Sequence, residues 1–481
     1  MDKEKNTVLI IGAGPSGLAA AYELIQLNAN LKPVIVEKLP CAGGLARTIY
    51  DGKSGIDIGG HRLFTKDKYI ENIWKKFLIV QNTPSVDDFL AHRTLTYPKE
   101  GADPNFVDDV LLIRKRFSAI LKNNKLYSYP IRFSFNTFKN LGLINSIIAL
   151  ASYFKSLICK KDNNNIKNFL INRFGYFLYS MFFDKHSKKV WGLDPSLIIN
   201  HWPKRRVQRM LFRMPSMWED EYFYPKYGCS QLWNKMAQYI LQNGGEIYFN
   251  SEFLNFNLVQ DKIVSASVNI NNVIKEIQAK YFISTIPIAN LIKSFDAPYD
   301  IKQYALNLPY RDYILVSLFT SKFNLENNTK FPTVSNKSPC SWIYLQNDDT
   351  KASRLQIMNN WSPYMVEDFK DNFIISLEYF CSQNDNLWNM SDYELSKLAI
   401  SEIEKYNLFS RYDINKSIVI REPKAYPIYS GSYQYIDKIK KYLGQYDNLF
   451  LSGRNGLHQY INMDYAMVCG INIARDIVKK V

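Results

Sequence analysis

The stretch from Val8 to Glu37 places the strongest constraint on how this chain can fold. An apolar β-branched run leads into the pattern Gly12-x-Gly14-x-x-Gly17, followed by a helix-like segment and a second apolar run that ends at Glu37. In a βαβ unit of this kind the first glycine permits the tight turn, the second lets a pyrophosphate approach, and the third lets the helix pack on the strand. The helix N-terminus offers free N–H groups to the phosphates, and the terminal acid can accept from ribose hydroxyls. Glycines alone would fit a turn in any α/β protein, but here every part of the unit agrees, so we expect a dinucleotide site.

Two glycine pairs downstream indicate which dinucleotide is bound. Gly43-Gly44 is followed by Leu45 and Arg47, and Gly59-Gly60 is followed by His61. Glycine pairs let the backbone come close to a flat or phosphorylated group, and an arginine fork matches phosphate. A nicotinamide that comes and goes does not need such loops, whereas a flavin held along its whole length does. We therefore expect FAD.

These motifs resemble the flavoprotein clan of flavin amine oxidases, protoporphyrinogen oxidases and UDP-galactopyranose mutases, whose second glycine motif has the form G-G-x-x-R. Segments 60–65, 117–136 and 182–195 resemble mutase motifs in order along the chain, as does the pair Gly453-Arg454 with Met463-Asp464. Segments 359–363, 378–381 and 453–458 are similar to a longer bacterial branch, labelled protoporphyrinogen-oxidase-like or amine-oxidase-like and often found among surface-polysaccharide genes.

Two departures from the mutase pattern concern the substrate side. The paired tyrosines that help hold the substrate diphosphate in the mutases correspond here to Tyr460 and Ile461. The mutase G-P-H is Gly59-Gly60-His61, and the second mutase histidine is Phe64. The resemblance therefore covers the flavin pocket more fully than the sugar-diphosphate grip.

The predicted fold is α/β, with a discontinuous Rossmann-like FAD-binding domain of the GR2 type, a helical cap and an antiparallel-sheet substrate domain. We assign residues 1–95, 222–290 and 416–481 to the FAD-binding domain, 96–221 to a mostly helical basic cap, and 291–415 to the substrate region. A hairpin is expected at Asn123-Asn124, and helices from 135 to 208. Apolar and polar residues alternate in 313–319 and 373–379, which predicts antiparallel strands.

Charge and cysteine usage narrow the class of partner. The net charge is +15, and basic residues outnumber acidic ones about two to one between residues 98 and 222. This asymmetry favours an anionic small molecule, and no nucleic-acid module accompanies it. Six scattered cysteines predict neither a zinc site nor disulfides, so we expect no metal, reduced thiols and a cytoplasmic protein. No signal peptide precedes the first strand, and a homo-oligomer is left open.

One apolar stretch, residues 141–158, approaches the length of a membrane span. It carries Asn145, Lys155 and several serines and falls short of a clean span. A buried or amphipathic helix is the favoured interpretation, and peripheral contact with a membrane is the less favoured alternative.

The resemblance assigns roles residue by residue. His61 and Arg354 are predicted to be catalytic, with His61 at the face of the flavin ring and Arg354 as the weaker candidate for an arm of a substrate clamp. The residues predicted to bind FAD are Gly12, Gly14, Pro15, Ser16, Gly17, Glu37, Lys38, Gly44, Leu45, Arg47, Gly59, Gly60, His61, Phe253, Thr285, Gly453, Arg454, Met463 and Asp464. The residues predicted to contact substrate are Trp191 and Tyr460, together with Arg205 and Arg206. The two arginines are chosen because they belong to the densest basic cluster of the chain, for which a solvated helix face is an equal alternative.

Two functions fit this set of residues. The favoured one is an FAD-dependent enzyme of an oxidoreductase family that acts on a nucleotide- or lipid-linked sugar, as in mutase-like ring contraction through a reduced flavin, with a nucleotide sugar preferred. The alternative is a dehydrogenase or oxidase of a non-nucleotide substrate, similar to the amine oxidases and protoporphyrinogen oxidases. In either case the flavin performs the chemistry, and the protein orients it and tunes its electrostatics.

Overall fold

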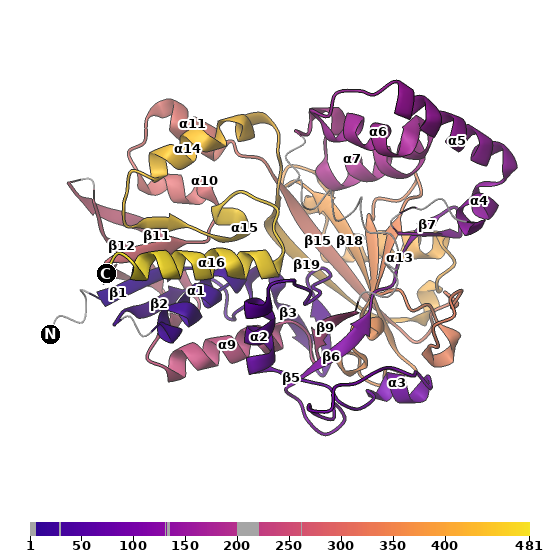
Figure 1. Cartoon of the computed structure of the whole chain (residues 1–481), viewed down its shortest axis with the longest axis horizontal. Coiled ribbons are helices and arrows are strands. Elements are labelled where there is room, and N and C mark those ends of the chain that lie inside the picture. Colours follow the sequence, from indigo (N-terminus) through magenta and orange to yellow (C-terminus); the bar gives the residue numbers. More distant parts are fainter. Residues whose placement is uncertain (1–5, 28–29, 130, 132–134, 200–220, 261) are drawn as a thin grey trace.

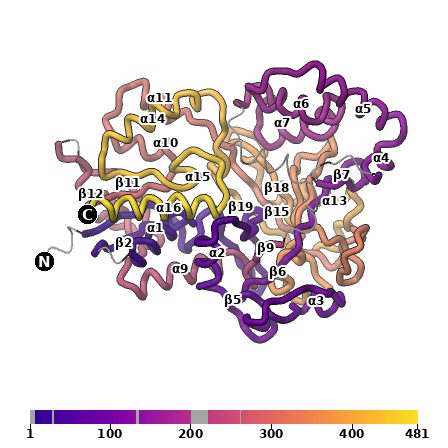
Figure 2. The backbone as a smooth tube through the Cα atoms, viewed as in Figure 1, coloured from indigo at the N-terminus to yellow at the C-terminus, as the bar shows by residue number. Residues whose placement is uncertain are grey.

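A computed structural model describes residues 6–27, 30–129, 131, 135–199, 221–260 and 262–481 (Figures 1 and 2). The βαβ unit forms as predicted from β1 (Thr7–Ile11), α1 (Pro15–Gln26) and β2 (Lys32–Val36). The four residues 8–11 of β1 are at most 2% exposed, because both faces of this sheet are covered by other elements.

Three further strands that lie far apart in the sequence complete this sheet. It has the order β10-β2-β1-β14-β20, with β10 (Glu246–Tyr248), β14 (Tyr281–Ser284) and β20 (Leu449–Leu451), and every neighbouring pair is parallel. Helix α9 (Ser230–Gln242) packs against α1, and α16 (Met463–Val478) runs along α1 (Figure 1). The predicted discontinuous Rossmann-like domain is thus confirmed.

A seven-stranded sheet stands beside the parallel one. Its order is β19-β15-β18-β17-β16-β7-β8, and every pair is antiparallel except β16 with β7. Its strands are β7 (Ser118–Lys122), β8 (Lys125–Ser128), β15 (Tyr310–Thr320), β16 (Trp342–Leu345), β17 (Arg354–Ile357), β18 (Phe373–Cys381) and β19 (Ile414–Pro427). Helix α13 (Asp392–Lys405) packs on β15 and β19, and the short α12 (Asn386–Asn389) precedes it. The predicted antiparallel sheet is confirmed.

Two of the predicted domain boundaries differ from the structure. The hairpin β7–β8, assigned to the helical cap, belongs to the seven-stranded sheet because β7 pairs with β16 over Ser118–Leu121. Strand β19 crosses the boundary placed at residue 416 because its pairing with β15 runs from Ile414 to Pro427. Alternation of apolar and polar residues predicts a strand, but it does not name the strand's partner.

The described part of the cap contains four α-helices. They lie above the seven-stranded sheet (Figures 1 and 2). They are α4 (Phe135–Leu141), α5 (Leu143–Ile158), α6 (Ile166–Tyr179) and α7 (Lys185–Trp191). The helical prediction for 135–208 is confirmed as far as Trp191. Residues 192–199 contain only a short 3-10 helix at Pro195–Leu197, and residues 200–208 lie outside the described residues. Within the described part of the chain, no single helix is long and apolar enough to cross a membrane.

Smaller elements connect these layers. The remaining strands are β3 (Thr48–Asp51), β4 (Ser54–Asp57), β5 (Ile79–Val80), β6 (Val110–Lys115), β9 (Glu221–Pro225), β11 (Ser251–Val259), β12 (Lys262–Ile270) and β13 (Val273–Gln278). The remaining helices are α2 (Lys68–Phe77), α3 (Val86–Leu90), α10 (Ile288–Leu291), α11 (Tyr299–Leu306), α14 (Ile436–Leu443) and α15 (Gly453–Gly456).

Candidate flavin site

A cavity of about 620 Å³ lies at the carboxyl ends of β1 and β2 and at the starts of α1 and α16. This is the edge of a parallel sheet at which α/β proteins bind dinucleotides. Of the residues predicted to bind FAD, the cavity is lined by Gly12, Gly14, Pro15, Ser16, Glu37, Lys38, Gly44, Leu45, His61, Phe253, Thr285, Gly453, Arg454 and Met463. The parallel sheet therefore brings together side chains that are as far as 451 residues apart in the sequence, from Gly12 to Met463.

The three glycines of the first motif have different surroundings. A Cβ on Gly12 would lie 2.2 Å from Thr285 Oγ1, and Gly12 has a φ of +106°. A Cβ on Gly17 would lie 2.0 Å from the carbonyl oxygen of Gly12, so Gly17 allows close packing without lining the cavity. A Cβ on Gly14 would meet nothing within 4 Å. The backbone at Gly14 thus borders open space at the N-terminus of α1, which suits a pyrophosphate.

Glu37 is fixed at the cavity wall by backbone hydrogen bonds. The N–H of Ala13 donates to Glu37 Oε2 at 2.7 Å, and the N–H of Leu39 donates to Oε1 at 2.8 Å. Burial raises the pKa of Glu37, opposed by these N–H groups and by the charge of Arg47. Each carboxylate oxygen retains a further acceptor site for a ribose hydroxyl.

Arg47 does not line this cavity. Its guanidinium forms a buried ion pair with Glu422 and donates to the carbonyl oxygen of Gly44 at 2.9 Å. Its guanidinium therefore links the Gly43-Gly44 loop to β19 and is not directed at the cavity. The predicted phosphate contact of Arg47 is not supported by this arrangement.

The second glycine pair also serves packing. A Cβ on Gly60 would lie 2.9 Å from Trp361 and 3.1 Å from Trp342, so the flat groups it approaches are indole rings of the protein itself. Gly59 has a φ of +93°, a conformation that favours glycine. Neither residue lines the cavity, but the turn they form presents His61 to it.

His61 is partly buried at the cavity wall, with 15% of its side chain exposed. Burial, together with the positive charges of Arg454 and Arg354, lowers the pKa of His61 to about 3. Its Nδ1 has no hydrogen bond among the described residues and lies 4.0 Å from Asp57 Oδ2. A neutral imidazole at the wall of a flavin cavity can accept or relay a proton. The catalytic role of His61 stays a prediction.

Arg454 faces the cavity without an acidic partner among the described residues. It donates to the carbonyl oxygen of Ile461 at 2.9 and 3.2 Å and to that of Ala425 at 3.2 Å. Its guanidinium carbon lies 5.4 and 4.9 Å from the ring centroids of Tyr426 and Tyr460. These carbonyl oxygens fix the position of the guanidinium but do not neutralise its charge.

An aromatic wall, defined by Trp191, Tyr426 and Tyr460, adjoins Arg454. Tyr426 and Tyr460 are stacked with centroids 5.2 Å apart, and Trp191 meets Tyr460 edge-on at 6.4 Å. The two predicted substrate residues Trp191 and Tyr460 are therefore brought together, although one comes from α7 and the other from the loop before α16.

Arg354 does not line the cavity and is engaged by protein groups. It forms an ion pair with the buried Glu378, donates to the Tyr426 hydroxyl at 3.2 Å, and lies 4.5 Å from the Trp342 ring centroid. The structure thus places Arg354 behind Tyr426, and its predicted catalytic role remains untested. Arg205 and Arg206, the other predicted substrate residues, lie outside the described residues.

Helix α16 begins at the cavity. Its N-cap residue Asn462 and its first residue Met463 line the cavity, whereas Asp464 in the first turn does not. The free N–H groups of this helix start can stabilise negative charge. The helix start predicted at Met463 is confirmed.

Asp57, His61 and Cys229 bring three possible metal-ligand atoms within 4.8 Å of one another. Asp57 already accepts from Tyr224 at 2.7 Å and from Thr48 at 2.5 Å. Burial raises the pKa of the Cys229 thiol, which opposes the thiolate that a metal requires. This donor set is better suited to supporting His61 than to holding an ion.

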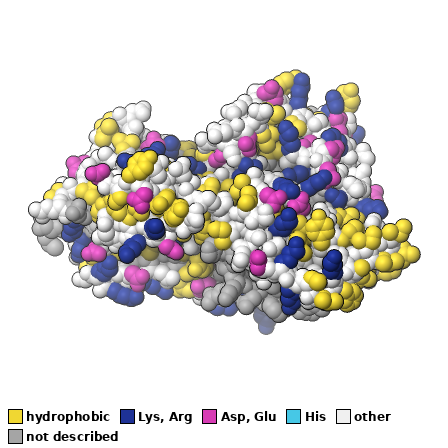
Figure 3. Space-filling model, turned by 90° about the horizontal axis from the view of Figure 1, so that it is seen from above, with side chains coloured by type: hydrophobic (Ala, Val, Ile, Leu, Met, Phe, Trp, Pro, Cys, Tyr) yellow, Lys and Arg dark blue, Asp and Glu magenta, His cyan; other side chains and the backbone are white. Residues whose placement is uncertain are grey.

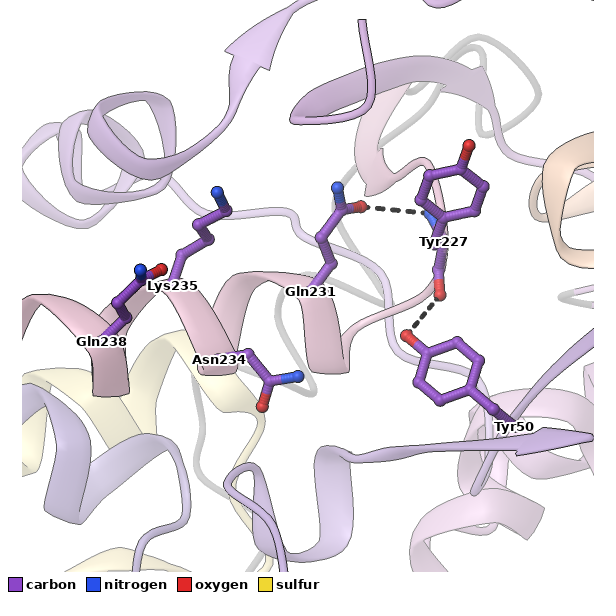
Figure 4. A pocket seen from close by; sticks show the side chains of 6 residues that line it. All are labelled: Tyr50, Tyr227, Gln231, Asn234, Lys235 and Gln238. Atoms are coloured by element: carbon purple, nitrogen blue, oxygen red, sulfur yellow. Dashed lines mark hydrogen bonds between the residues drawn. The ribbon is translucent and has the colours of Figure 1, made fainter. Parts of the chain in front are cut away.

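A second cavity, of about 350 Å³, lies on α9 and contains none of the predicted site residues (Figure 4). Its lining residues are Tyr50, Tyr227, Gln231, Asn234, Lys235 and Gln238. Tyr50 donates to the carbonyl oxygen of Tyr227 at 2.8 Å. The polar side chains of one helix face, open to solvent, supply no reactive group.

Several residues of the site were not predicted from the sequence, and four of them bear on its chemistry. Tyr426 and Glu422 come from β19, Asp57 lies behind His61, and Asn455 lines the cavity with a buried Oδ1 that has no partner among the described residues. Asp57 belongs to the same short segment as Gly59 and Gly60, so its position was a usable signal. Tyr426 and Glu422 carry no such signal, because only the pairing of β19 with β15 places them here.

Residues 15–478 match the family described as flavin containing amine oxidoreductase. The chain belongs to this family. It is therefore a flavin-dependent enzyme of an oxidoreductase family, and its cofactor is FAD.

Curated relatives match only short segments. The chain is 35% identical over 80 residues to uncharacterized protein R188 of Acanthamoeba polyphaga mimivirus, and 39% identical over 66 residues to a ferredoxin–NADP reductase of Gluconacetobacter diazotrophicus. These matches cover 16% and 14% of the chain, and only 16% and 19% of the relatives' own lengths.

Solved structures match over the whole chain at low identity. Reduced UDP-galactopyranose mutase superposes with a TM-score of 0.77 at 18% identity, covering 99% of this chain and 96% of that one. A protein assigned as protoporphyrinogen oxidase from Exiguobacterium sp. 255-15 has a TM-score of 0.68 at 15% identity, covering 99% of both chains. Putrescine oxidase bound to putrescine has a TM-score of 0.58 at 14% identity, also covering 99% of both chains. At these identities the likeness shows the fold.

The residues present fit FAD. The open backbone at Gly14 suits the diphosphate, Glu37 can accept from a ribose, and His61 and Met463 would meet the flavin end. When bound, FAD supplies the electron-transfer chemistry that side chains lack.

Proposed function

We propose that this enzyme acts on an anionic sugar diphosphate, nucleotide- or lipid-linked, with mutase-like ring contraction as the favoured reaction. The observation that carries the proposal is an uncompensated guanidinium charge beside His61. Arg454 lines the cavity, acts on the pKa of His61 and has no carboxylate partner in the described part of the chain, whereas Arg354 is neutralised by Glu378. Arg62, the residue after His61 in the sequence, also lacks a carboxylate partner among the described residues.

Arg62 is held mainly by aromatic rings. Its guanidinium carbon lies 5.2 to 5.9 Å from the ring centroids of Tyr222, Trp361 and Trp342, and it donates to Ser118 Oγ at 3.0 Å. A guanidinium shielded from water and without a counter-ion gains from an anionic ligand and repels a cationic one. The charges around His61 thus favour a diphosphate over a polyamine such as putrescine.

The aromatic wall supports the sugar part of the proposal. Trp191, Tyr426 and Tyr460 present large, partly apolar surfaces beside Arg454, and aromatic surfaces with a few polar groups are typical of small-molecule sites. The match to UDP-galactopyranose mutase over 99% of the chain agrees with this substrate class. All six cysteines are free, in keeping with a reducing, cytoplasmic setting, where nucleotide sugars for polysaccharide synthesis would be available.

The test compares oxidised and dithionite-reduced enzyme under anaerobic conditions. Each form is incubated with UDP-galactopyranose, and the nucleotide sugars are separated by chromatography; putrescine with oxygen serves as the second substrate arm. The proposal expects UDP to bind and a ring-isomerised product to form only with reduced enzyme. Failure of UDP to bind, or oxygen consumption with a non-nucleotide substrate, would favour the oxidase-like alternative.

A further inference from the structure

The cap carries a surface whose side chains are unusually apolar. Nine large hydrophobic side chains of α4 and α5 are exposed, with Phe135 82%, Leu143 78%, Ile144 75% and Ile158 84% exposed. The other five are Ile147, Ile148, Leu150, Phe154 and Leu157; together the nine define the α4–α5 face. Figure 3 shows hydrophobic side chains gathered at its right-hand end, the end that α4 and α5 occupy in Figure 1, with Lys and Arg side chains among them. A contiguous exposed patch of this kind marks an interaction site.

Helix α5 buries its small side chains and exposes its large apolar ones, the reverse of what is usual for a surface helix of a globular protein. The side chains it buries are small, Ser146, Ala149 and Ser156. Helix α6 approaches closely at Gly175, where a Cβ would lie 2.7 Å from the backbone nitrogen of Tyr153. Small residues let the two helices pack closely, while the large side chains point outward. An ordinary amphipathic helix does the opposite and turns its Leu and Ile residues to the core.

The charged side chains of the α4–α5 segment and of the two lysines that follow it are all positive. No acidic residue occurs between Asp109 and Asp162 in the sequence. Lys139, Lys155, Lys160 and Lys161 are exposed, and none forms an ion pair with a described residue. An apolar face rimmed by lysines complements a lipid surface with anionic headgroups, because the chains accept the apolar residues and the headgroups attract the ammonium groups.

The length of α5 and its bend from α4 favour a position on the surface of a bilayer over a path across it. Helix α5 has 16 residues and is about 24 Å long at ~1.5 Å per residue, shorter than a hydrocarbon layer of about 30 Å. Its axis is bent by 116° from that of α4 at Gly142. The pair therefore forms a bent apolar surface rather than a straight span.

We propose that the α4–α5 face docks this enzyme on the surface of a bilayer that contains anionic phospholipids. The apolar side chains enter the boundary between headgroups and acyl chains, and the flanking lysines contact the headgroups. This inference does not depend on the proposed substrate.

The test is vesicle flotation of the purified, FAD-loaded full-length protein. Vesicles of phosphatidylcholine with phosphatidylglycerol are compared with vesicles of phosphatidylcholine alone, using wild type and the double variant Ile144→Ser, Ile147→Ser. The matched control is Val273→Ser, Ile274→Ser on β13, which removes two equally exposed apolar side chains elsewhere. We expect wild type and control to float with the anionic vesicles, and the α5 variant to bind at least tenfold more weakly.

The depth to which the α4–α5 face enters the bilayer is tested with Phe154→Trp. The fluorescence of the new tryptophan should be quenched more by lipids brominated near the headgroup than by lipids brominated at the chain ends. The proposal is overturned if wild type does not float, if the α5 variant floats as well as the control, or if quenching is strongest at the chain ends. Self-association through this face, seen as dimers by sedimentation that the α5 variant abolishes without any lipid binding, would also overturn it.

Discussion

Helices α16 and α5 are both 16 residues long and both have one apolar side, yet they face opposite surroundings. Helix α16 buries Met463, Met467, Ile471 and Ile477 in the core that it shares with α1 and α2, whereas α5 buries serine and alanine and exposes isoleucine and leucine. Periodicity predicts a helix and an apolar side, but not what covers that side. For α16 the cover is the flavin domain itself, and for α5 the described protein provides none.

The largest difference between the two helices should follow a change where α16 meets α1. A Cβ on Gly470 would lie 2.1 Å from the carbonyl oxygen of Ser16, so Gly470→Val must push the helices apart. We expect a loss of about 3 kcal/mol or more in unfolding free energy, with weakened FAD binding, measured by thermal melts and flavin absorbance. In the cap, Gly142→Ala meets no atom within 4 Å but keeps a φ of +78°, so it should cost only about 1 kcal/mol. Equal losses at the two glycines would remove the contrast.

A second variant distinguishes loss of turnover from loss of FAD binding at the cavity where α16 begins. His61→Ala should lower turnover by about 10²-fold or more, because a proton-relaying group at the cavity wall is lost. FAD content should stay at the wild-type level, since His61 lies away from the Gly14 turn. The control is the exposed His92→Ala. Unchanged turnover in His61→Ala would return His61 to a structural role.

Low pH should lower the stability of the fold but should not change vesicle binding by the α4–α5 face. Burial lowers the pKa of His61 and His186 to about 3 and that of His458 to about 4. The unfolded chain, with histidine pKa values near ~6.5, then binds more protons below that pH, so stability falls as pH drops from about 6.5 toward 4. Each histidine can cost up to roughly 1.4 kcal/mol per pH unit.

Melting temperatures measured between pH 8 and pH 4.5 check this dependence, and His61→Ala should give a shallower decline than wild type. The α4 and α5 segments contain no acidic or histidine residue, so vesicle binding should stay constant from pH 8 to pH 5. A melting temperature independent of pH, or the same slope in His61→Ala, would contradict the lowered pKa of His61.

The smallest effect is expected on the α5 surface. Ile144→Ser with Ile147→Ser should change the unfolding free energy by less than about 0.5 kcal/mol per site, because both side chains are exposed in the folded protein. The matched change Ile471→Ser in α16, at a site only 2% exposed, should cost about 3 kcal/mol. Thermal melts of the two variants compare them directly, and a large loss from the α5 pair would mean that protein covers this face.

Local patterns in the sequence were enough to predict the βαβ unit, the helix start at Met463 and the hairpin at Asn123-Asn124, because each depends on neighbouring residues. They also predicted half of the residues that line the cavity. They did not predict that Arg47 pairs with Glu422, because that contact joins positions 375 apart through the pairing of β19. Tyr426 was missed for the same reason. Likewise, an apolar helix sequence does not state which of its faces the protein covers, as α5 shows.

The most direct test of the central claim is the FAD content of wild type and of Gly14→Val. A Cβ at Gly14 would meet no protein atom within 4 Å, and Gly14 lines the cavity, so a valine there should leave the fold intact and obstruct the cofactor. We expect wild type to be yellow and to release about one FAD per chain on denaturation. Gly14→Val should be folded by circular dichroism but bind FAD at least about tenfold more weakly, a loss of ~1.4 kcal/mol. A colourless wild type that binds NAD and rejects FAD, or a folded Gly14→Val that holds FAD as tightly as wild type, would contradict it.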